Sequence, residues 1–340
     1  MIRTVVIGLG MGLNYHVPKI IDHPNFELVA VSDVNQEKLA LAKEKYNVQG
    51  YEDTYKMLIT EKPNLAVIAS PTQFHAEQAI QAMEMGIDVF LEKPMARDTN
   101  EARQIYEVQK RTGRKLMIFQ PHRAFTDTIT VKGIIDKGIL GNIYMIKRTM
   151  SCFLIRTSWQ AYKKNGGGTL NNHGAHFIDQ MLYLSGGKPE NVSCELLRVA
   201  ATGDADDCAR IMIKTDSGML LDIEMNMVST INLTPWVIHG TRGTAMYTIN
   251  DEGKPVVRVR YCEPDVELEQ QVYHKTGNVS EAAEYPWQIE DFEIKDEYAV
   301  NYYDLCYEYY GLGKDPFVPL EDTLAVMEVL EKCHEVTGKY

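Results

Sequence analysis

A lysine in this sequence has the surroundings expected of a group that handles a substrate proton. Lys93 lies in the run Glu92-Lys93-Pro94, directly after the apolar residues 89–91. A charged pair at the carboxyl end of a buried parallel strand lies where open α/β sheets bind their ligands. The proline restricts the preceding backbone and permits a cis bond, which would fix the direction of the ammonium. Most lysines are solvated surface residues, but an ammonium held in this way can stabilise a developing alkoxide.

A histidine is the second candidate, and it lies on a predicted helix. After the glycine run 166–168, Asn172, His176 and Asp179 follow at spacings of four and three. These spacings align the three side chains on one face of a helix whose neighbouring positions are apolar. A lone histidine is more often a satisfied core residue, whereas three aligned polar side chains need partners or a cavity. We therefore predict His176 as a general base, since its reference pKa is about 6.5.

A glycine turn near the start of the chain suits a phosphate-containing ligand. The apolar residues 4–7 lead into Gly8-Leu9-Gly10-Met11-Gly12-Leu13, just before a helical segment. Glycine permits positive φ and lets backbone amides approach a pyrophosphate at a helix N-terminus. The pattern is imperfect because Leu13 occupies the position of the expected third glycine, and a tight turn without a ligand would look similar. The predicted cofactor contacts are Gly8, Gly10, Met11 and Gly12.

An aspartate at the end of the second apolar run strengthens the prediction of a dinucleotide site. Asp33 follows residues 28–31. A carboxylate there can accept hydrogen bonds from an adenosine ribose diol, and it would repel a 2′-phosphate. The sequence therefore favours NAD over NADP as the cofactor.

The elements that must position these groups alternate between β and α in the first 120 residues. Continuous apolar runs, typical of strands covered on both faces, occur at residues 4–7, 28–31, 65–68, 89–91 and 116–119. Helical patterns lie between them at residues 36–45, 53–60, 73–85 and 98–112, and Asp98 or Thr99 can cap the last. Such alternation predicts βαβ units and a doubly wound parallel sheet in an α/β protein.

The pattern changes after Pro121. A helix is expected at residues 125–137, and the chain is β-rich from residue 143. Residues 219–227 alternate apolar and polar side chains opposite residues 210–214, which predicts a half-buried antiparallel hairpin. Residues 295–312 and 320–336 are predicted as helices. We place a boundary near residue 120, which gives two contiguous domains, 1–120 and 121–340.

Charge and composition exclude several classes of partner. Lys and Arg number 35 against 47 Asp and Glu, for a net charge of −12. This argues against a nucleic-acid partner. No apolar run approaches the roughly 18–20 residues that span a bilayer, so we expect a soluble chain. The scattered cysteines show no CxxC spacing, which suits the reducing cytoplasm. The cluster Asp204, Asp206 and Asp207 lacks a nearby histidine and is predicted as a solvated turn, so no metal is expected.

These motifs resemble the glucose-fructose oxidoreductase/inositol dehydrogenase (Gfo/Idh/MocA) family of nicotinamide-dependent enzymes. The resemblance covers nearly the whole chain. Beyond the glycine turn, Asp33 and Lys93, it rests on residues 70–75, 86–94, 120–123, 138–141, 168–179, 240–244 and 318–322.

The resemblance implies a Rossmann domain followed by an α/β domain with a large, mostly antiparallel open sheet. Relatives often oligomerise through that sheet, so a homodimer or homotetramer is expected. The implied reaction is hydride transfer between NAD and a secondary alcohol of a sugar, sugar derivative or cyclitol.

The resemblance also assigns residues. It implies that Lys93 is the catalytic lysine and His176 the acid/base. Ser70, Pro71, His75 and Glu92 would line the cofactor with Lys93, while His122 and Arg123 would lie near the substrate. Trp159 is a candidate stacking platform for a sugar ring, although core packing is as plausible for it.

Asn172 departs from the family pattern, because many relatives carry an aspartate one helical turn before the histidine. An amide can orient His176 but supplies no negative charge to raise its basicity. We therefore expect Lys93 and His176 to carry the proton transfer, with Asn172 assisting only by orientation.

Two other functions remain open from the sequence. One is a glycosidase that uses bound NAD to oxidise a ring carbon transiently before elimination of the aglycone. The other is a regulator that binds NAD and a sugar without turnover. Retention of both Lys93 and His176 argues against the regulator, because a sensor needs no proton relay.

Overall fold

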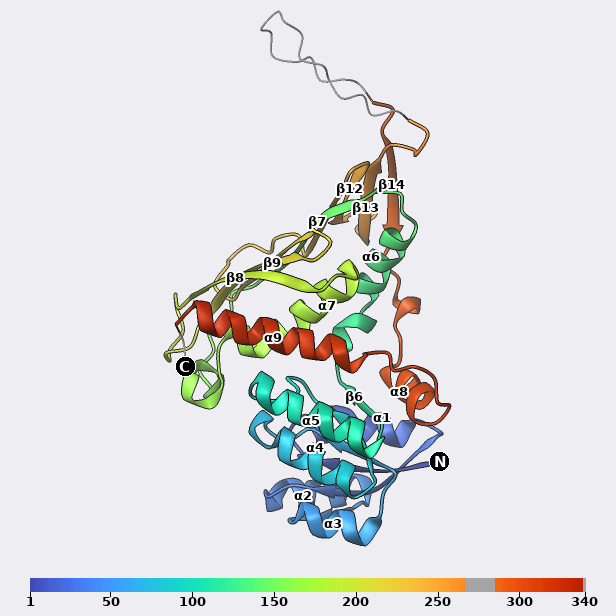
Figure 1. Cartoon of the computed structure of the whole chain (residues 1–340), viewed down its shortest axis with the longest axis vertical. Helices are drawn as coiled ribbons and strands as arrows, with labels where there is room; N and C mark the ends of the chain where they lie inside the picture. The colour runs from blue at the N-terminus through green and yellow to red at the C-terminus, as the bar shows by residue number, and fades with distance from the viewer. Residues whose placement is uncertain (267–284, 339–340) are drawn as a thin grey trace, which may run out of the picture. The chain divides into compact units, whose positions relative to one another are not determined.

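The structure, a computed structural model, describes residues 1–266 and 285–338, and it divides into two compact units (Figure 1). The first unit combines Met1–Ala124 with the described residues from Val300 to Gly338, and the second lies within Phe125–Ala299. The division differs from the contiguous domains 1–120 and 121–340 predicted from sequence. The difference arises because the last two helices pack with the first unit.

The first unit is built on a six-stranded sheet in the order β3-β2-β1-β4-β5-β6. All of its strand pairs are parallel, and the strand order reverses between β1 and β4. Its strands are β1 (Ile2–Ile7), β2 (Phe26–Ser32), β3 (Gln49–Tyr51), β4 (Leu65–Ile68), β5 (Asp88–Leu91) and β6 (Leu116–Ile118). This is the doubly wound order that binds dinucleotides at the reversal point. The predicted parallel sheet is confirmed.

Helices connect these strands, and three of the connecting helices, α2, α3 and α5, begin with a side-chain cap. Asn35, Asp53 and Asp98 each accept hydrogen bonds from backbone amides in the first turn. The helices of the first unit are α1 (Val17–Asp22), α2 (Gln36–Tyr46), α3 (Thr54–Glu61), α4 (His75–Glu84), α5 (Thr99–Thr112), α8 (Tyr302–Tyr310) and α9 (Leu320–Val336). Across the described residues, no helix has the length and apolar character needed to cross a membrane.

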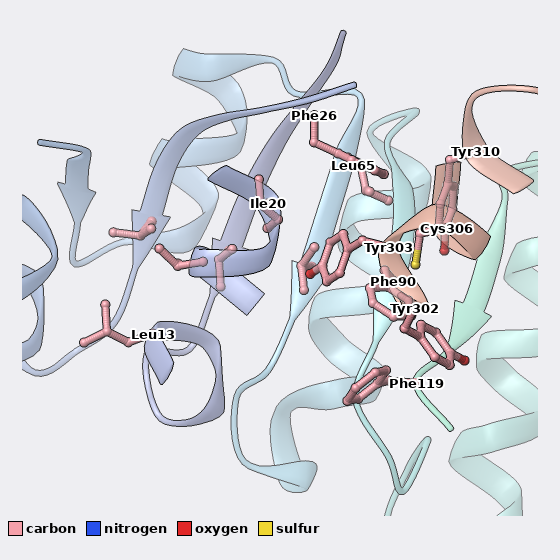
Figure 2. Packing of buried hydrophobic residues seen from close by; sticks show 14 of the residues in the cluster. Leu13, Ile20, Phe26, Leu65, Phe90, Phe119, Tyr302, Tyr303, Cys306 and Tyr310 are labelled. Carbon is pink, nitrogen blue, oxygen red and sulfur yellow. The ribbon is translucent and has the colours of Figure 1, made fainter. Parts of the chain in front are cut away.

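The core of the first unit needs aromatic residues from α8. Figure 2 shows Tyr302, Tyr303 and Tyr310 beside Phe90 and Phe119 of the sheet. The rings of Phe90 and Tyr302 are stacked with centroids 5.9 Å apart, and Tyr302 meets Phe119 edge-on at 4.9 Å. Aromatic pairs in such geometries add about 0.5–1.5 kcal/mol beyond the burial of their area. The C-terminal segment is therefore part of this core.

Helix α9 lies along α5, as Figure 1 shows. Tyr106 donates a hydrogen bond to Glu321 at 3.2 Å, and Arg103 pairs with Glu328 at 3.3 Å. Both contacts are exposed, so each contributes little to stability by itself. They fix the register between the two helices.

The second unit is built on an eight-stranded sheet in the order β14-β13-β12-β11-β7-β10-β9-β8. Only the β7–β10 pair is parallel, so the predicted, mostly antiparallel sheet is confirmed. Its elements are α6 (Thr126–Asp136), β7 (Ile143–Ser151), α7 (Ala175–Ser185), β8 (Pro189–Leu197), β9 (Cys208–Thr215), β10 (Leu220–Asn226), β11 (Trp236–Gly240), β12 (Gly243–Ile249), β13 (Pro255–Tyr261) and β14 (Gln288–Glu293). The predicted hairpin is β9–β10.

A buried arginine joins α7 to this sheet. The Arg148 guanidinium of β7 lies between two rings, 4.7 Å from the Phe177 centroid and 4.4 Å from that of Trp236. Asp127 lies 3.9 Å from this guanidinium and accepts a 2.7 Å hydrogen bond from the Trp236 indole. Burial lowers the pKa of Arg148 to about 10, an effect that Asp127 partly opposes.

Candidate cofactor and catalytic site

The glycine turn after β1 fits tightly against the neighbouring strand. Gly8 has a φ of +89°, and a Cβ there would lie 2.5 Å from the backbone nitrogen of Ser70. Only glycine fits such a site without displacing the backbone. The turn after β1 and the loop after β4 are thus in direct contact, which brings together Gly8 and Ser70, two residues predicted to contact the cofactor.

The third glycine of the expected pattern has a substitute one residue earlier. A Cβ on Gly12 would lie 2.8 Å from Val6 Cγ1, so Gly12 provides the close approach of helix to strand. The chain continues as a π-helical turn, Gly12–His16, with Leu13 buried. Gly10 faces open space and Met11 is 53% exposed, so the outer surface of the turn is accessible to a ligand.

Asp33 is held against this turn. Its carboxylate accepts hydrogen bonds from the backbone amides of Leu9 at 2.7 Å and Asn35 at 2.8 Å. Lys38 lies 3.6 Å from the same carboxylate. An acidic group fixed beside the glycine turn at the switch point fits the adenosine half of NAD. The described residues therefore fit this cofactor.

His75 connects the loops after β4 and β5. Its ring nitrogens each lie 2.9 Å from a backbone carbonyl, one of Ser70 and one of Pro94. A neutral imidazole donates to only one of these carbonyls at a time, whereas the protonated ring donates to both. Burial lowers the pKa of His75, while the two carbonyls and Glu92 oppose that shift. Pro71 is exposed beside this junction.

The Glu92-Lys93-Pro94 run follows β5 as predicted, and its Lys93–Pro94 bond is cis. The Glu92 carboxylate is buried and accepts a 3.1 Å hydrogen bond from the backbone amide of Lys93. The Lys93 side chain is half-buried. Burial lowers the pKa of its ammonium, and the neighbouring Glu92 charge acts in the opposite direction.

Two residues that sequence reasoning missed also reach Glu92. His16 Nε2 lies 3.2 Å from the Glu92 carboxylate, and His16 Nδ1 lies 2.8 Å from the Tyr303 hydroxyl. The available signal for His16 was a histidine within one helical turn of Gly12. Tyr303 had no such signal, because more than half of the chain separates it from the turn.

The segment after β6 forms a short 3-10 helix, Pro121–Ala124, with two of the predicted substrate residues. Arg123 is almost fully buried, and its guanidinium pairs with Asp322 of α9 at 3.0 Å. His122 is half-buried. Contact of either residue with a substrate stays a prediction, and the structure gives Arg123 a role in joining α9 to β6.

The predicted polar helix of the second unit begins with a π-helical turn, Leu170–Gly174, and continues as α7. His176 is 8% exposed and Asp179 is fully buried, so the polar stripe does lie in a buried helix. Asp206 accepts a 3.0 Å hydrogen bond from the Leu170 amide and thereby caps this helix. A Cβ at Gly168 would lie 2.4 Å from Asp206, which explains the glycine before the cap.

Neighbours of Asn172 extend the candidate site. The Gln160 side chain donates a 3.2 Å hydrogen bond to the Asn172 side-chain oxygen. Arg156 donates to the side-chain oxygen of Gln160. Arg156 also lies 2.9 Å from His173 Nε2, which must accept because a guanidinium only donates. Trp159 begins a 3-10 helix, Trp159–Ala161, and its side chain lies outside the described residues.

The acidic cluster is structural, but the prediction of a solvated turn is wrong. Asp206 and Asp207 are buried. Asp207 accepts backbone hydrogen bonds from residues 199–201, and Asp204 accepts one from Lys163. In the described parts of the chain, no group of three or more His, Cys, Asp or Glu side chains is arranged to hold a metal ion.

Comparisons with known proteins agree with this geometry. Residues 2–120 match the oxidoreductase family with an NAD-binding Rossmann fold, and residues 128–246 match the GFO/IDH/MocA C-terminal domain. D-glucoside 3-dehydrogenase of Escherichia coli is 30% identical over a match that covers 54% of each chain. The uncharacterised E. coli oxidoreductase YdgJ is 24% identical, and its match covers 97% of this chain and 94% of YdgJ. The rhizopine catabolism protein MocA of Rhizobium meliloti is 27% identical over 56% of this chain and 59% of MocA.

Solved structures share the fold over the full chain. A NAD-binding protein from Listeria innocua superposes with a TM-score of 0.81 at 24% identity, covering 99% of this chain and 95% of that one. An Agrobacterium radiobacter oxidoreductase, solved with NAD+, L-tartaric acid and magnesium, gives 0.81 at 14% identity, covering 99% and 96%. With both family domains matched in order and the expected sheets present, this chain belongs to the Gfo/Idh/MocA family of NAD-binding oxidoreductases.

Proposed function

We propose that this protein transfers hydride between NAD and a secondary alcohol of a sugar, sugar derivative or cyclitol. Two relatives support the substrate class by their names, since one is a glucoside 3-dehydrogenase and the other acts in rhizopine catabolism. Bound NAD would supply the hydride acceptor or donor. Gly8, Gly10, Met11, Gly12 and Asp33 would hold its adenosine and pyrophosphate part, and Ser70, Pro71, His75 and Glu92 would line the rest.

The observation that carries the proposal is the environment of Lys93. This lysine follows β5 at the sheet edge that also carries the glycine turn, and burial lowers its pKa. An amine with a lowered pKa exchanges its proton with a hydroxyl more readily than a solvated lysine does. In its charged form it stabilises the alkoxide that develops as hydride leaves the carbon. Both properties serve oxidation of an alcohol.

His176 is the proposed partner in proton handling. It is a buried histidine on the polar face of α7, one helical turn beyond Asn172. We infer that its imidazole takes the hydroxyl proton and that Asn172 orients the ring without supplying charge. His122, Arg123 and Trp159 remain candidate substrate contacts. Assembly through the large sheet of the second unit also remains a prediction.

Turnover of a defined panel tests the proposal. Purified protein is mixed with NAD and, in separate reactions, with sugars, cyclitols and aryl glycosides, while the nicotinamide absorbance is recorded. An absorbance change proportional to ketone product supports a dehydrogenase. Release of aglycone without a net absorbance change indicates the NAD-assisted glycosidase instead. Tight NAD binding with no turnover across the panel contradicts the proposal and favours a regulator.

A further inference from the structure

The Glu92 carboxylate is a junction between three parts of the first unit that are distant in sequence. Its two oxygens have separate partners, the Lys93 backbone amide at 3.1 Å and His16 Nε2 at 3.2 Å. The other nitrogen of His16 meets the Tyr303 hydroxyl at 2.8 Å. The connection therefore runs from α8 through the turn after β1 to the backbone of the proposed catalytic lysine.

With Glu92 ionised and His16 neutral, the donor and acceptor rules fix the direction of each hydrogen bond. The carboxylate only accepts, so the His16 proton must lie on Nε2. Nδ1 is then an acceptor, and the Tyr303 hydroxyl must be its donor. The resulting chain runs from the Tyr303 hydroxyl to His16 and from His16 to Glu92. Each member is satisfied in a single arrangement of protons.

Burial makes this arrangement persistent. Tyr303 is fully buried and His16 is 1% exposed, so water does not compete for their polar atoms. Burial, reinforced by Cys306, Tyr15 and Glu92, raises the pKa of Tyr303 well above its usual value. Its hydroxyl therefore stays a donor at any working pH. Figure 2 shows Tyr303 beside Phe90 and Cys306.

We propose that Tyr303 and His16 are positioning residues that hold the Glu92 carboxylate against Lys93. This inference rests on the proposed function, since it explains how the lysine used there is oriented and kept charged. The carboxylate fixes the Lys93 backbone through the amide and supplies the negative charge beside its ammonium. Tyr303 and His16 touch neither substrate nor cofactor in this scheme. They act through Glu92.

Several titratable groups face Glu92, and each must be considered in a pH experiment. From the turn after β1 these are Tyr15 and His16, from α4 His75, and from α8 Tyr303, with Cys306 close to both tyrosines. Burial raises the pKa values of Tyr15, Tyr303 and Cys306, which keeps all three neutral near pH 7. Of the basic groups beside the carboxylate, His75 and Lys93 have pKa values lowered by burial.

The decisive measurement is the pKa of Lys93 in the full chain without substrate. Lysines are reductively methylated with isotope-enriched formaldehyde, and the methyl resonance of Lys93, assigned with Lys93→Arg, is titrated by NMR. In Tyr303→Phe, His16 Nδ1 loses its donor, so the imidazole is no longer held from both sides and its contact with Glu92 is loosened. The Lys93 pKa should then fall by about half a unit, because the Glu92 charge opposes the effect of burial less strongly.

Tyr310→Phe is the matched control. Tyr310 is a buried tyrosine of the same helix whose hydroxyl donates to the backbone carbonyl of Val89 instead of to His16. We expect a comparable loss of stability with no change in the Lys93 pKa. Equal Lys93 pKa values in wild type, Tyr303→Phe and Tyr310→Phe overturn the proposal, as does an equal fall in both variants.

A second measurement keeps the inference testable if Tyr303→Phe does not fold. Nitrogen NMR shifts of the His16 ring in the wild-type protein report which nitrogen carries the proton. A proton on Nε2 supports the chain, and a proton on Nδ1 overturns it. Neither measurement needs turnover, so failure of the substrate panel would leave this result standing, and the reverse also holds.

Discussion

Each unit contains a partly or fully buried cation with one carboxylate near it that favours its charged form. The two cations differ in what surrounds them. Burial lowers the pKa of Lys93 in the first unit and of Arg148 in the second, while Glu92 and Asp127 act against the shift. Arg148 is enclosed, with aromatic rings around its guanidinium and the carbonyls of Thr149 and Pro235 as acceptors. Lys93 is half-buried at the end of a strand.

Enclosure distinguishes the Arg148 cation, which serves the fold, from the Lys93 cation, which we propose serves a ligand. The Arg148 guanidinium is surrounded by parts of its own unit, and its charge joins β7 to α6 and α7. Lys93 is only half-buried, and its backbone amide donates to the Glu92 carboxylate. A lowered pKa alone does not distinguish these roles. The extent of burial does distinguish them, since Arg148 is buried and Lys93 is half-buried.

The largest expected effect is on activity at Lys93. Lys93→Met removes the proton-handling group, so turnover of any substrate found in the panel should fall by about 10²–10⁴-fold. The NAD dissociation constant, measured by fluorescence titration, should change little. Lys115→Met is the control, because Lys115 donates to the Tyr309 carbonyl at 2.7 Å and plays no part in the site. Similar turnover in the two variants would remove Lys93 from the mechanism.

The next effect is on stability at Arg148. Arg148→Met leaves the half-buried Asp127 without its cation and leaves the carbonyls of Thr149 and Pro235 without this donor, so the unfolding free energy should fall by about 1–3 kcal/mol. Urea unfolding followed by circular dichroism measures the loss. The control is Arg258→Met, which breaks an exposed pair with Asp291 in the same sheet and should cost no more than about 1 kcal/mol. Equal costs would show that the enclosure of Arg148 has no energetic importance.

Two glycines of the cofactor turn should also differ in their effects: substitution of one should lower stability, and substitution of the other should weaken NAD binding. Gly8→Ala forces a side chain into positive φ and against Ser70, so unfolding free energy should fall by about 1–3 kcal/mol. Gly10→Ala meets open space within the protein, so its stability should match wild type. We expect Gly10→Ala to weaken NAD binding instead, since its methyl group occupies the ligand side of the turn. Unchanged NAD affinity in Gly10→Ala would place the cofactor elsewhere.

The lowered pKa of Lys93 has a consequence for stability with a defined sign. Between its folded pKa and the unfolded value of about 10.4, the unfolded chain binds more protons, so stability rises with pH. Below the pKa of Lys93 in the folded protein, its ammonium is charged in both states, and the full cost of burying this charge lowers the free energy of unfolding. Lys93→Met should therefore unfold at a higher urea concentration than wild type at pH 7, and the difference should shrink towards pH 10. A lower midpoint at pH 7 would contradict this account.

The smallest expected effect is at Asn172. Asn172→Asp keeps the oxygen that accepts from Gln160 and adds a negative charge one turn before His176. The acidic limb of the pH–rate profile should move upward by about half a unit, since a nearby anion favours the imidazolium. Asn172→Gln serves as the uncharged control. An unmoved profile would show that charge at this position does not reach His176.

Local patterns predicted most of the first unit. The buried strands and capped helices were identified because apolar runs, period and cap residues are encoded within a few positions, as at Asp98. β3 was missed because Gln49–Tyr51 is a short edge strand without an apolar run. The helix predicted over 295–312 is present only in part: a 3-10 turn spans Asp296–Tyr298, and α8 begins at Tyr302, where Asn301 caps it.

Long-range contacts could not be read from the sequence. Nothing local to Tyr303 indicates that its hydroxyl reaches His16, and nothing local to α9 indicates that Asp322 pairs with Arg123. The candidate Lys93 was identified because strand and charge are adjacent in sequence. The network that supports Lys93 was missed, since topology alone brings its members together.

The inserted arrangement of the second unit has a consequence for synthesis of the chain. Residues up to Ala124 leave the ribosome well before α8, whose aromatic side chains complete their core. While the inserted unit is translated, part of the apolar surface of the nascent first unit stays uncovered, and its core stays incomplete. Competence to bind nicotinamide dinucleotide therefore appears only after translation has passed Tyr310, which makes late truncations as damaging to this unit as early ones.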